Sequence, residues 1–237
     1  SSKTAVTFGT TTVIIIVTLA VFAIALVLSM LDAHAARLST SLHLAHDELI
    51  KLALHDSLTR LPNRLLFATR LEQRIQECQH SQRSFSLLFL DLDGFKIIND
   101  AHGHHTGDLL LAEVAARITG LLGASDTASR FGGDEFVLAL APGDLSQTTA
   151  FAERLLAALA QPYEWEHHSL HITASIGIAV YPQDGTSLHE LTLNADAAMY
   201  YAKERGRNGY YCFDSAMNAN AHQQFLLQQA LRHALER

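Results

Sequence analysis

The sequence is poor in cysteine and lacks several motifs that mark common enzyme classes. Its two cysteines, Cys78 and Cys212, lie far apart and have no CxxC spacing, which argues against a disulfide framework and fits a reducing compartment. No GxxxxGKS/T loop, GxSxG elbow or HExxH helix is present, which excludes the P-loop, hydrolase and zinc-protease chemistries that these motifs serve. The formal net charge is −7, so the composition does not indicate nonspecific nucleic-acid binding.

One long apolar run is present near the N-terminus. From Val13 to Met30 the chain carries no charge, and Thr18 and Ser29 are the only polar residues. A run of about 18 or more such residues is long enough to cross a bilayer as a helix. We therefore expect a transmembrane helix over residues 5–31, with a buried core helix or a signal peptide as the alternatives. The first residue is Ser rather than Met, so we expect the chain to be part of a longer protein.

A heptad pattern follows the apolar run. Apolar or small residues recur at alternating steps of four and three, uninterrupted by Gly or Pro, at Leu31, Ala35, Leu38, Leu42, Ala45, Leu49 and Leu52. This spacing is typical of a coiled-coil seam. It predicts a parallel dimeric stalk over residues 32–55, and a single amphipathic helix packed on its own domain is the alternative.

Beyond the stalk, helical and strand patterns alternate. Helices are predicted over 65–79, 106–122, 146–161 and 187–207, and strands over 84–93, 127–131, 135–140, 167–181 and 209–213. Two short strands form a hairpin in the middle of this order, which excludes a doubly wound parallel sheet. The pattern predicts an α+β fold with a central mixed sheet flanked by helices.

Two acidic pairs stand at the ends of apolar strands. Asp91 and Asp93 share one face of a strand because side chains alternate, and Asp134 and Glu135 stand at the bend of the hairpin. If these strands share a sheet, the carboxylates converge and repel one another, and a hard cation such as Mg²⁺ relieves that repulsion. The alternative is that Asp93 caps the next turn and the bend carboxylates are solvated.

The residues around these acids are suited to a nucleotide. Gly132 and Gly133 permit positive φ at the bend and a close approach of a ligand to the backbone. Lys96 can meet a phosphate, and Asn99 and Asp108 offer an amide and a carboxylate that suit a guanine edge. Asp108 also stands at the start of a predicted helix, where it could simply favour the helix dipole.

Two further pairs have helical spacing. Lys203 and Arg207 are four residues apart on one face of a predicted helix, where they could clamp phosphates or be solvated. His167 and His171 are also four apart, but their segment reads as loop or strand, so no zinc site is predicted there.

Together these motifs resemble those of the GGDEF family of diguanylate cyclases. The signature stands at Gly132–Phe136, and the stretches DSLTRLPNR, DLDGFKIIND, GHHTGD, ASIGIA and ADAAMYYAKERGRN follow the family order and spacing. The resemblance covers Asp56 to about Phe213 and implies a GGDEF domain over residues 56–213. The family fold resembles the palm of nucleotidyl cyclases and polymerases, which agrees with the predicted element order.

The resemblance also implies roles for individual residues. Mg²⁺, or Mn²⁺ in its place, would be bound by Asp91, the Leu92 carbonyl, Asp134 and Glu135. Asn99 and Asp108 would read guanine with His104 nearby, and the phosphates would be held by Lys96, Lys203 and Arg207 beside Gly132 and Gly133. Catalysis would fall to Asp134, Glu135 and Lys96, with either acid as the base.

The implied reaction joins two GTP molecules into cyclic di-GMP and releases two pyrophosphates. Each 3′-hydroxyl would attack the α-phosphate held by the other subunit of a homodimer, which the predicted stalk would provide.

The predicted span would attach the chain to the inner (cytoplasmic) membrane, with the GGDEF domain in the cytoplasm. Residues 214–237 resemble the helical linker that leads to an EAL phosphodiesterase domain in tandem proteins, although no EAL domain is present in this sequence.

Two functions stay open at this point. One is an active cyclase, and the other is a catalytically silent GTP-binding domain that regulates an attached EAL phosphodiesterase. The intact Asp134–Glu135 pair favours the first, and the polar site disfavours a passive membrane scaffold.

In many family members an Arg-x-x-Asp motif before the hairpin binds product, but here Gly123 replaces the arginine while Asp126 remains. We therefore expect no product inhibition through this position.

Overall fold

The computed structural model describes residues 19, 21–22, 26, 28–34, 37–40, 50–140, 144–165 and 168–217. The chain divides into two compact units, Ser1–Ala53 and Leu54–Arg237. In the first unit every described residue is helical. Among the described residues, no helix combines the length and the apolar character that crossing a membrane requires. Most of the span predicted over 5–31 lies outside these residues, so it stays a prediction.

The heptad positions are only partly covered by the described residues. Leu31, Leu38 and Leu52 are helical and exposed. The remaining predicted seam positions, Ala35, Leu42, Ala45 and Leu49, lie outside the described residues. The coiled-coil stalk over 32–55 therefore also stays a prediction.

The second unit contains two sheets and five helices among its described residues. The strands are β1 (Phe85–Asp93), β2 (Thr127–Gly132), β3 (Glu135–Leu140), β4 (Tyr163–Trp165), β5 (His168–Leu170), β6 (Thr173–Tyr181) and β7 (Gly209–Cys212). The helices are α2 (Arg64–Ser81), α3 (Phe95–His102), α4 (His104–Leu121), α5 (Leu145–Leu159) and α6 (Leu188–Glu204). The main sheet has the order β2-β3-β1-β6-β7, in which β6 and β7 are parallel and the other neighbours antiparallel. This confirms the predicted α+β fold with a mixed central sheet.

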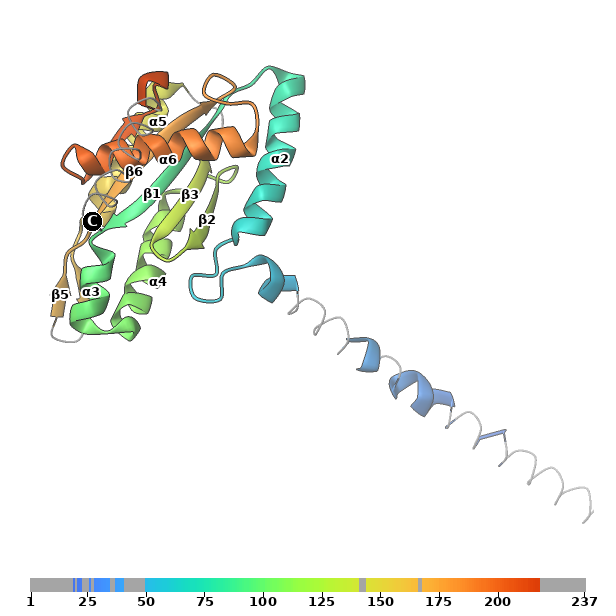
Figure 1. Ribbon diagram of the computed structural model, residues 1–237. Helices are drawn as coiled ribbons and strands as arrows, with labels where there is room; N and C mark the ends of the chain where they lie inside the picture. Colours follow the sequence, from blue (N-terminus) through green and yellow to red (C-terminus); the bar gives the residue numbers. More distant parts are fainter. Residues whose placement is uncertain are drawn as a thin grey trace, which may run out of the picture. The chain divides into compact units, whose positions relative to one another are not determined.

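Side-chain alternation gives the sheet two buried faces, each covered by helices (Figure 1). Leu88 and Leu90 of β1 belong to a core shared with α4 and α5, whereas Leu87 and Phe89 belong to a core shared with α2 and α6. Burial of one such side chain stabilises the fold by about 1.5–3 kcal/mol. Because the period of a strand is two, the next odd-numbered residue of β1, Asp91, lies on the α2 and α6 face.

The structure differs from the predicted elements in five respects. The short helix α3 was not predicted, because it has only eight residues and lies between Gly94 and Gly103, both of which have positive φ. The hairpin of β4 and β5 was not predicted either, and the strand expected over 167–181 is divided into β5 and β6.

The other two differences concern helix ends. Helix α4 begins at His104, so Asp108 lies one turn inside the helix and not at its start, where a role for the helix dipole was considered. Helix α6 ends at Glu204 and does not reach Arg207, because Gly206, Arg207 and Asn208 all have positive φ.

Candidate active site

The acidic hairpin lies against the end of β1, as the sequence predicted. Asp91 is the register partner of Glu135, and the Leu92 amide donates to the Asp134 carbonyl oxygen at 3.3 Å. Asp91 is 9% exposed, whereas Asp134 and Glu135 are half-buried. The two acidic segments therefore meet at one end of the sheet.

Asp91 forms an ion pair with a residue that was predicted to hold phosphate. The Lys203 Nζ lies 2.7 Å from the Asp91 Oδ1. Burial raises the pKa of Asp91 above its usual range, Lys203 opposes this shift, and the charges of Asp134 and Asp93 add to it. A predicted metal residue and a predicted phosphate residue are thus in direct contact.

Asp93 links three backbone segments. Its carboxylate accepts hydrogen bonds from the Thr173 Oγ1 at 2.7 Å, the Ser175 Oγ at 2.8 Å and the Asn208 amide at 3.1 Å. It therefore ties β1 to β6 and to the loop after α6, which was neither of the two roles considered from the sequence.

The predicted placement of Arg207 on one helix with Lys203 is wrong. It does not share a helical face with Lys203, because α6 has ended and Arg207 has φ 61°. Its amide donates to the Ala202 carbonyl oxygen at 3.1 Å, and its side chain is exposed. Arg207 therefore stands on the loop between α6 and β7, two residues before the strand that pairs with β6.

The hairpin is anchored by a pair that sequence reasoning missed. Arg130 forms an ion pair with Asp56 at 3.2 Å, and its Nε donates to the Gly133 carbonyl oxygen at 2.9 Å. Burial alone would raise the pKa of Asp56, but hydrogen bonds from Thr59 and the charge of Arg130 hold it below its usual range. Gly132 and Gly133 have φ of 154° and 54° and leave open space beside the bend. The available signal was the position of Arg130, two residues before the first glycine of the signature.

A second group of predicted site residues stands on α3 and α4. The Asn99 Oδ1 is buried and has no hydrogen-bond partner among the described residues. Its amide lies against Gly107, where an added Cβ would overlap it. Asp108 follows on α4 and is exposed, as are His104 at the start of α4 and Lys96 on α3. The Asn99 amide is therefore held directly beside Asp108 of the neighbouring helix.

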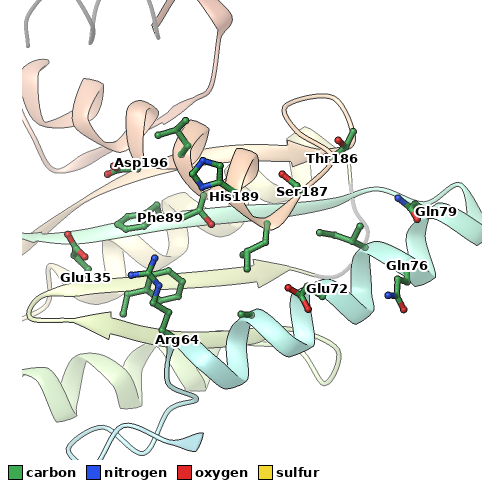
Figure 2. Close-up of a pocket in the computed structure, with 16 residues that line it drawn as sticks. Arg64, Glu72, Gln76, Gln79, Phe89, Glu135, Thr186, Ser187, His189 and Asp196 are labelled. Carbon is green, nitrogen blue, oxygen red and sulfur yellow. The ribbon is translucent and has the colours of Figure 1, made fainter.

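Glu135 opens onto a groove of about 890 Å³ between α2 and α6. In Figure 2, Glu135 and Asp196 lie toward one end of this groove, and Thr186 and Gln79 lie toward the other. Burial raises the pKa of Glu135, and the charges of Asp196, Asp91 and Asp134 raise it further. Asp196 was not singled out from the sequence, because its distance from Glu135 depends on how α6 packs.

The site fits a hard divalent cation only in combination with further ligands. In the part of the chain that the structure describes, no three His, Cys, Asp or Glu side chains are grouped as metal ligands. However, Asp91, the Leu92 backbone, Asp134 and Glu135 lie close enough together that the charges of Asp134 and Asp91 disfavour ionisation of their neighbours. Mg²⁺ commonly takes one or two carboxylates and completes its shell with phosphate oxygens and water, and these oxygen donors suit such a cation.

The sequence matches the family profile described as diguanylate cyclase, GGDEF domain, over residues 53–209. The bifunctional diguanylate cyclase/cyclic di-GMP phosphodiesterase MucR of Pseudomonas aeruginosa is 55% identical over 228 residues, which cover 94% of this chain and 33% of MucR. The cyclic di-GMP phosphodiesterase NbdA of the same organism is 39% identical over 195 residues, covering 81% of this chain and 24% of NbdA. The chain thus spans a third or less of the length of these curated relatives.

Solved structures share the fold. The isolated GGDEF domain of TpbB (also called YfiN) from P. aeruginosa has a TM-score of 0.69 at 35% identity, over 71% of this chain and 99% of that one. The coiled coil and GGDEF domain of DgcB from Caulobacter crescentus, in complex with c-di-GMP, has a TM-score of 0.67 at 28% identity. It covers 77% of this chain and 98% of that one.

Proposed function

This chain belongs to the GGDEF family of diguanylate cyclases, and from that premise we propose that it condenses two GTP molecules into cyclic di-GMP and two pyrophosphates. The observation that carries the proposal is the pairing of Glu135 with the buried Asp91 beside an intact Asp134. Carboxylates that converge at one strand end repel one another unless a cation compensates them, and such a cation is what the reaction requires.

Each substrate would be held at both of its ends. Asn99 and Asp108 would bind the guanine edge, and His104 would lie near it. Lys96, Lys203 and Arg207 would bind the phosphates, and the open bend at Gly132 and Gly133 would leave room for the nucleotide. The Asn99 amide packs on Gly107, the residue directly before Asp108, so the two side chains stand next to each other on α3 and α4, which supports their joint assignment to guanine.

The oxygen donors of Asp91, the Leu92 carbonyl, Asp134 and Glu135 would hold Mg²⁺, or Mn²⁺ in its place. The ion would neutralise phosphate charge and orient the reacting groups. The base would be Asp134 or Glu135, the two carboxylates that stand at the bend of the hairpin. It would take the proton from the 3′-hydroxyl as that oxygen bonds to an α-phosphorus and the bond to pyrophosphate breaks.

Ring closure requires two such half-sites facing each other, so we propose a homodimer with the 32–55 segment as its coiled-coil stalk. The apolar, uncharged run from Val13 to Met30 supports attachment to the inner membrane, with the GGDEF domain in the cytoplasm. The similarity to MucR supports an attached EAL domain in the full protein.

The alternative function is a silent GTP-binding domain that controls an attached phosphodiesterase. The similarity to NbdA supports this alternative, because NbdA is named as a cyclic di-GMP phosphodiesterase and not as a cyclase. Incubation of the purified chain with GTP and Mg²⁺, followed by chromatography of the nucleotides, separates the two. The proposal predicts cyclic di-GMP and pyrophosphate, both absent from Asp91→Asn and Asp134→Asn variants and present in Asp100→Asn, which alters an exposed acid on α3. The alternative predicts bound, unreacted GTP.

A further inference from the structure

The ion pair of Lys203 and Asp91 joins a residue assigned to phosphate with a residue assigned to the metal. The side chains are 27% and 12% exposed, so the pair is largely shielded from water. Lys203 is in the last turn of α6, and the negative charges of Asp134 and Asp93 act on Asp91 as well.

We propose that Lys203 is the counter-ion of Asp91 before substrate binds, and that it is exchanged for the divalent cation when a triphosphate arrives. This rests on the proposed function. The protein then binds the cation weakly in the absence of nucleotide, and the cation and the nucleotide phosphates bind cooperatively.

The exchange follows from the chemistry of the two groups. The Asp91 oxygen that contacts the ammonium group at 2.7 Å cannot accept a metal ion at the same position. A lysine carries its charge on a flexible four-carbon stem, so the Nζ can leave Asp91 without movement of α6. A phosphate gives the ammonium group a new anionic partner, and Asp91 is then free for the cation. Because coupling is reciprocal, the cation must also favour nucleotide binding.

Lys96 provides a matched control. It is also assigned to phosphate, but it is exposed on α3 and forms no ion pair with any residue that the structure describes. Lys96→Met therefore removes one positive charge from the same region without breaking the contact to Asp91.

The experiment measures Mn²⁺ binding by electron paramagnetic resonance on the full 237-residue chain without nucleotide. Lys203→Met should bind Mn²⁺ about tenfold more tightly than Lys96→Met, within the usual range of coupling between sites. Lys203→Arg, which keeps a cation beside Asp91, should bind as weakly as the wild type. Lys203→Gln replaces the Met variant if the latter does not fold.

Equal Mn²⁺ affinity in the Lys203→Met and Lys96→Met variants would overturn the exchange. The proposed function is judged separately, by cyclic di-GMP formation in the wild type. A wild type that makes the product while both variants bind Mn²⁺ equally would refute only the exchange, whereas a wild type that makes no product refutes the proposed function.

Discussion

Gly177 of β6 lies directly beneath the backbone of Ala195 in α6. A Cβ at Gly177 would overlap the Ala195 carbonyl oxygen and the Met199 amide nitrogen. The absence of a side chain therefore allows α6 to pack against the sheet at backbone distance. This close packing sets the height of α6 over the sheet, from which Lys203 reaches Asp91.

Replacement of Gly177 with alanine should consequently destabilise the fold by about 3 kcal/mol, the upper end of the usual cost of overpacking, because the clash is with backbone. It should also reduce cyclic di-GMP synthesis by displacing Lys203. Urea unfolding measures the first effect. Gly209→Ala in β7 is the control, since a Cβ there meets only the Arg207 carbonyl oxygen at 3.6 Å. Equal stability of the two variants would contradict the packing argument.

Gly107→Ala should weaken GTP binding while the fold is retained. The new methyl group overlaps the Asn99 amide, which can rotate away but then leaves the proposed guanine position. Loss of that hydrogen bond predicts an increase in KM for GTP of about tenfold. Steady-state kinetics provide the measurement.

Gly120→Ala on the same helix is the control for this prediction, because nothing lies within 4 Å of its Cβ position. It should leave KM unchanged and stabilise the helix by about 1 kcal/mol. An unchanged KM in Gly107→Ala would show that Asn99 does not read the base.

Stability should depend on pH through Glu135. Its folded-state pKa is raised above the ordinary 4.5, mainly by burial and then by neighbouring acids, so the folded chain holds this proton more tightly than the unfolded chain. The resulting contribution to stability is present below the ordinary value and is lost as pH rises through the folded-state pKa. Glu135→Gln should therefore gain stability relative to wild type at pH 7 in metal-free buffer, and this gain should shrink toward pH 4.

Urea unfolding at several pH values tests this, with Glu72→Gln removing an exposed charge from the same groove as the control. A Glu135→Gln variant whose advantage is the same at pH 4 and pH 7 would be at odds with the raised pKa.

Cyclic di-GMP should not inhibit the protein by binding at the Gly123–Asp126 turn, which precedes β2. The Asp126 Oδ2 accepts from the Gly123 amide at 2.8 Å, so the remaining acid of the motif is engaged locally and no arginine stands at position 123. Two missing charge-assisted hydrogen bonds, at about 1.5–3 kcal/mol each, weaken binding by two or more orders of magnitude. Calorimetry should detect no cyclic di-GMP binding at micromolar concentration at this turn, and Gly123→Arg should gain it. Tight binding to the unmodified chain that is lost in Asp126→Ala would refute the prediction.

The elements that depend on local sequence patterns could be predicted from the sequence. The apolar run of β1, the glycine bend and the amphipathic α4 were predicted close to their observed positions, and the pairing of the hairpin with β1 brought Asp91 and Glu135 together as expected. The helix α3 was missed because it has only eight residues and is enclosed by two glycines, which are more typical of a loop.

Contacts between distant segments could not be predicted in the same way. Asp56 and Arg130 are separated by 74 positions, and Lys203 reaches Asp91 only because α6 packs closely on Gly177. The misplacement of Arg207 has a local cause: Gly206 was read as part of a helix that its positive φ instead helps to end.

The most direct test of the account is a mixing experiment with the wild-type chain and Asp134→Asn. The two are combined in varying proportion at constant total protein, allowed to exchange subunits, and supplied with GTP and Mg²⁺ while cyclic di-GMP is quantified. If ring closure needs two intact half-sites in one dimer, the rate should follow the square of the wild-type fraction and fall to about one quarter at equal mixing. A rate proportional to the wild-type fraction, or no cyclic di-GMP from the pure wild type, would contradict the account.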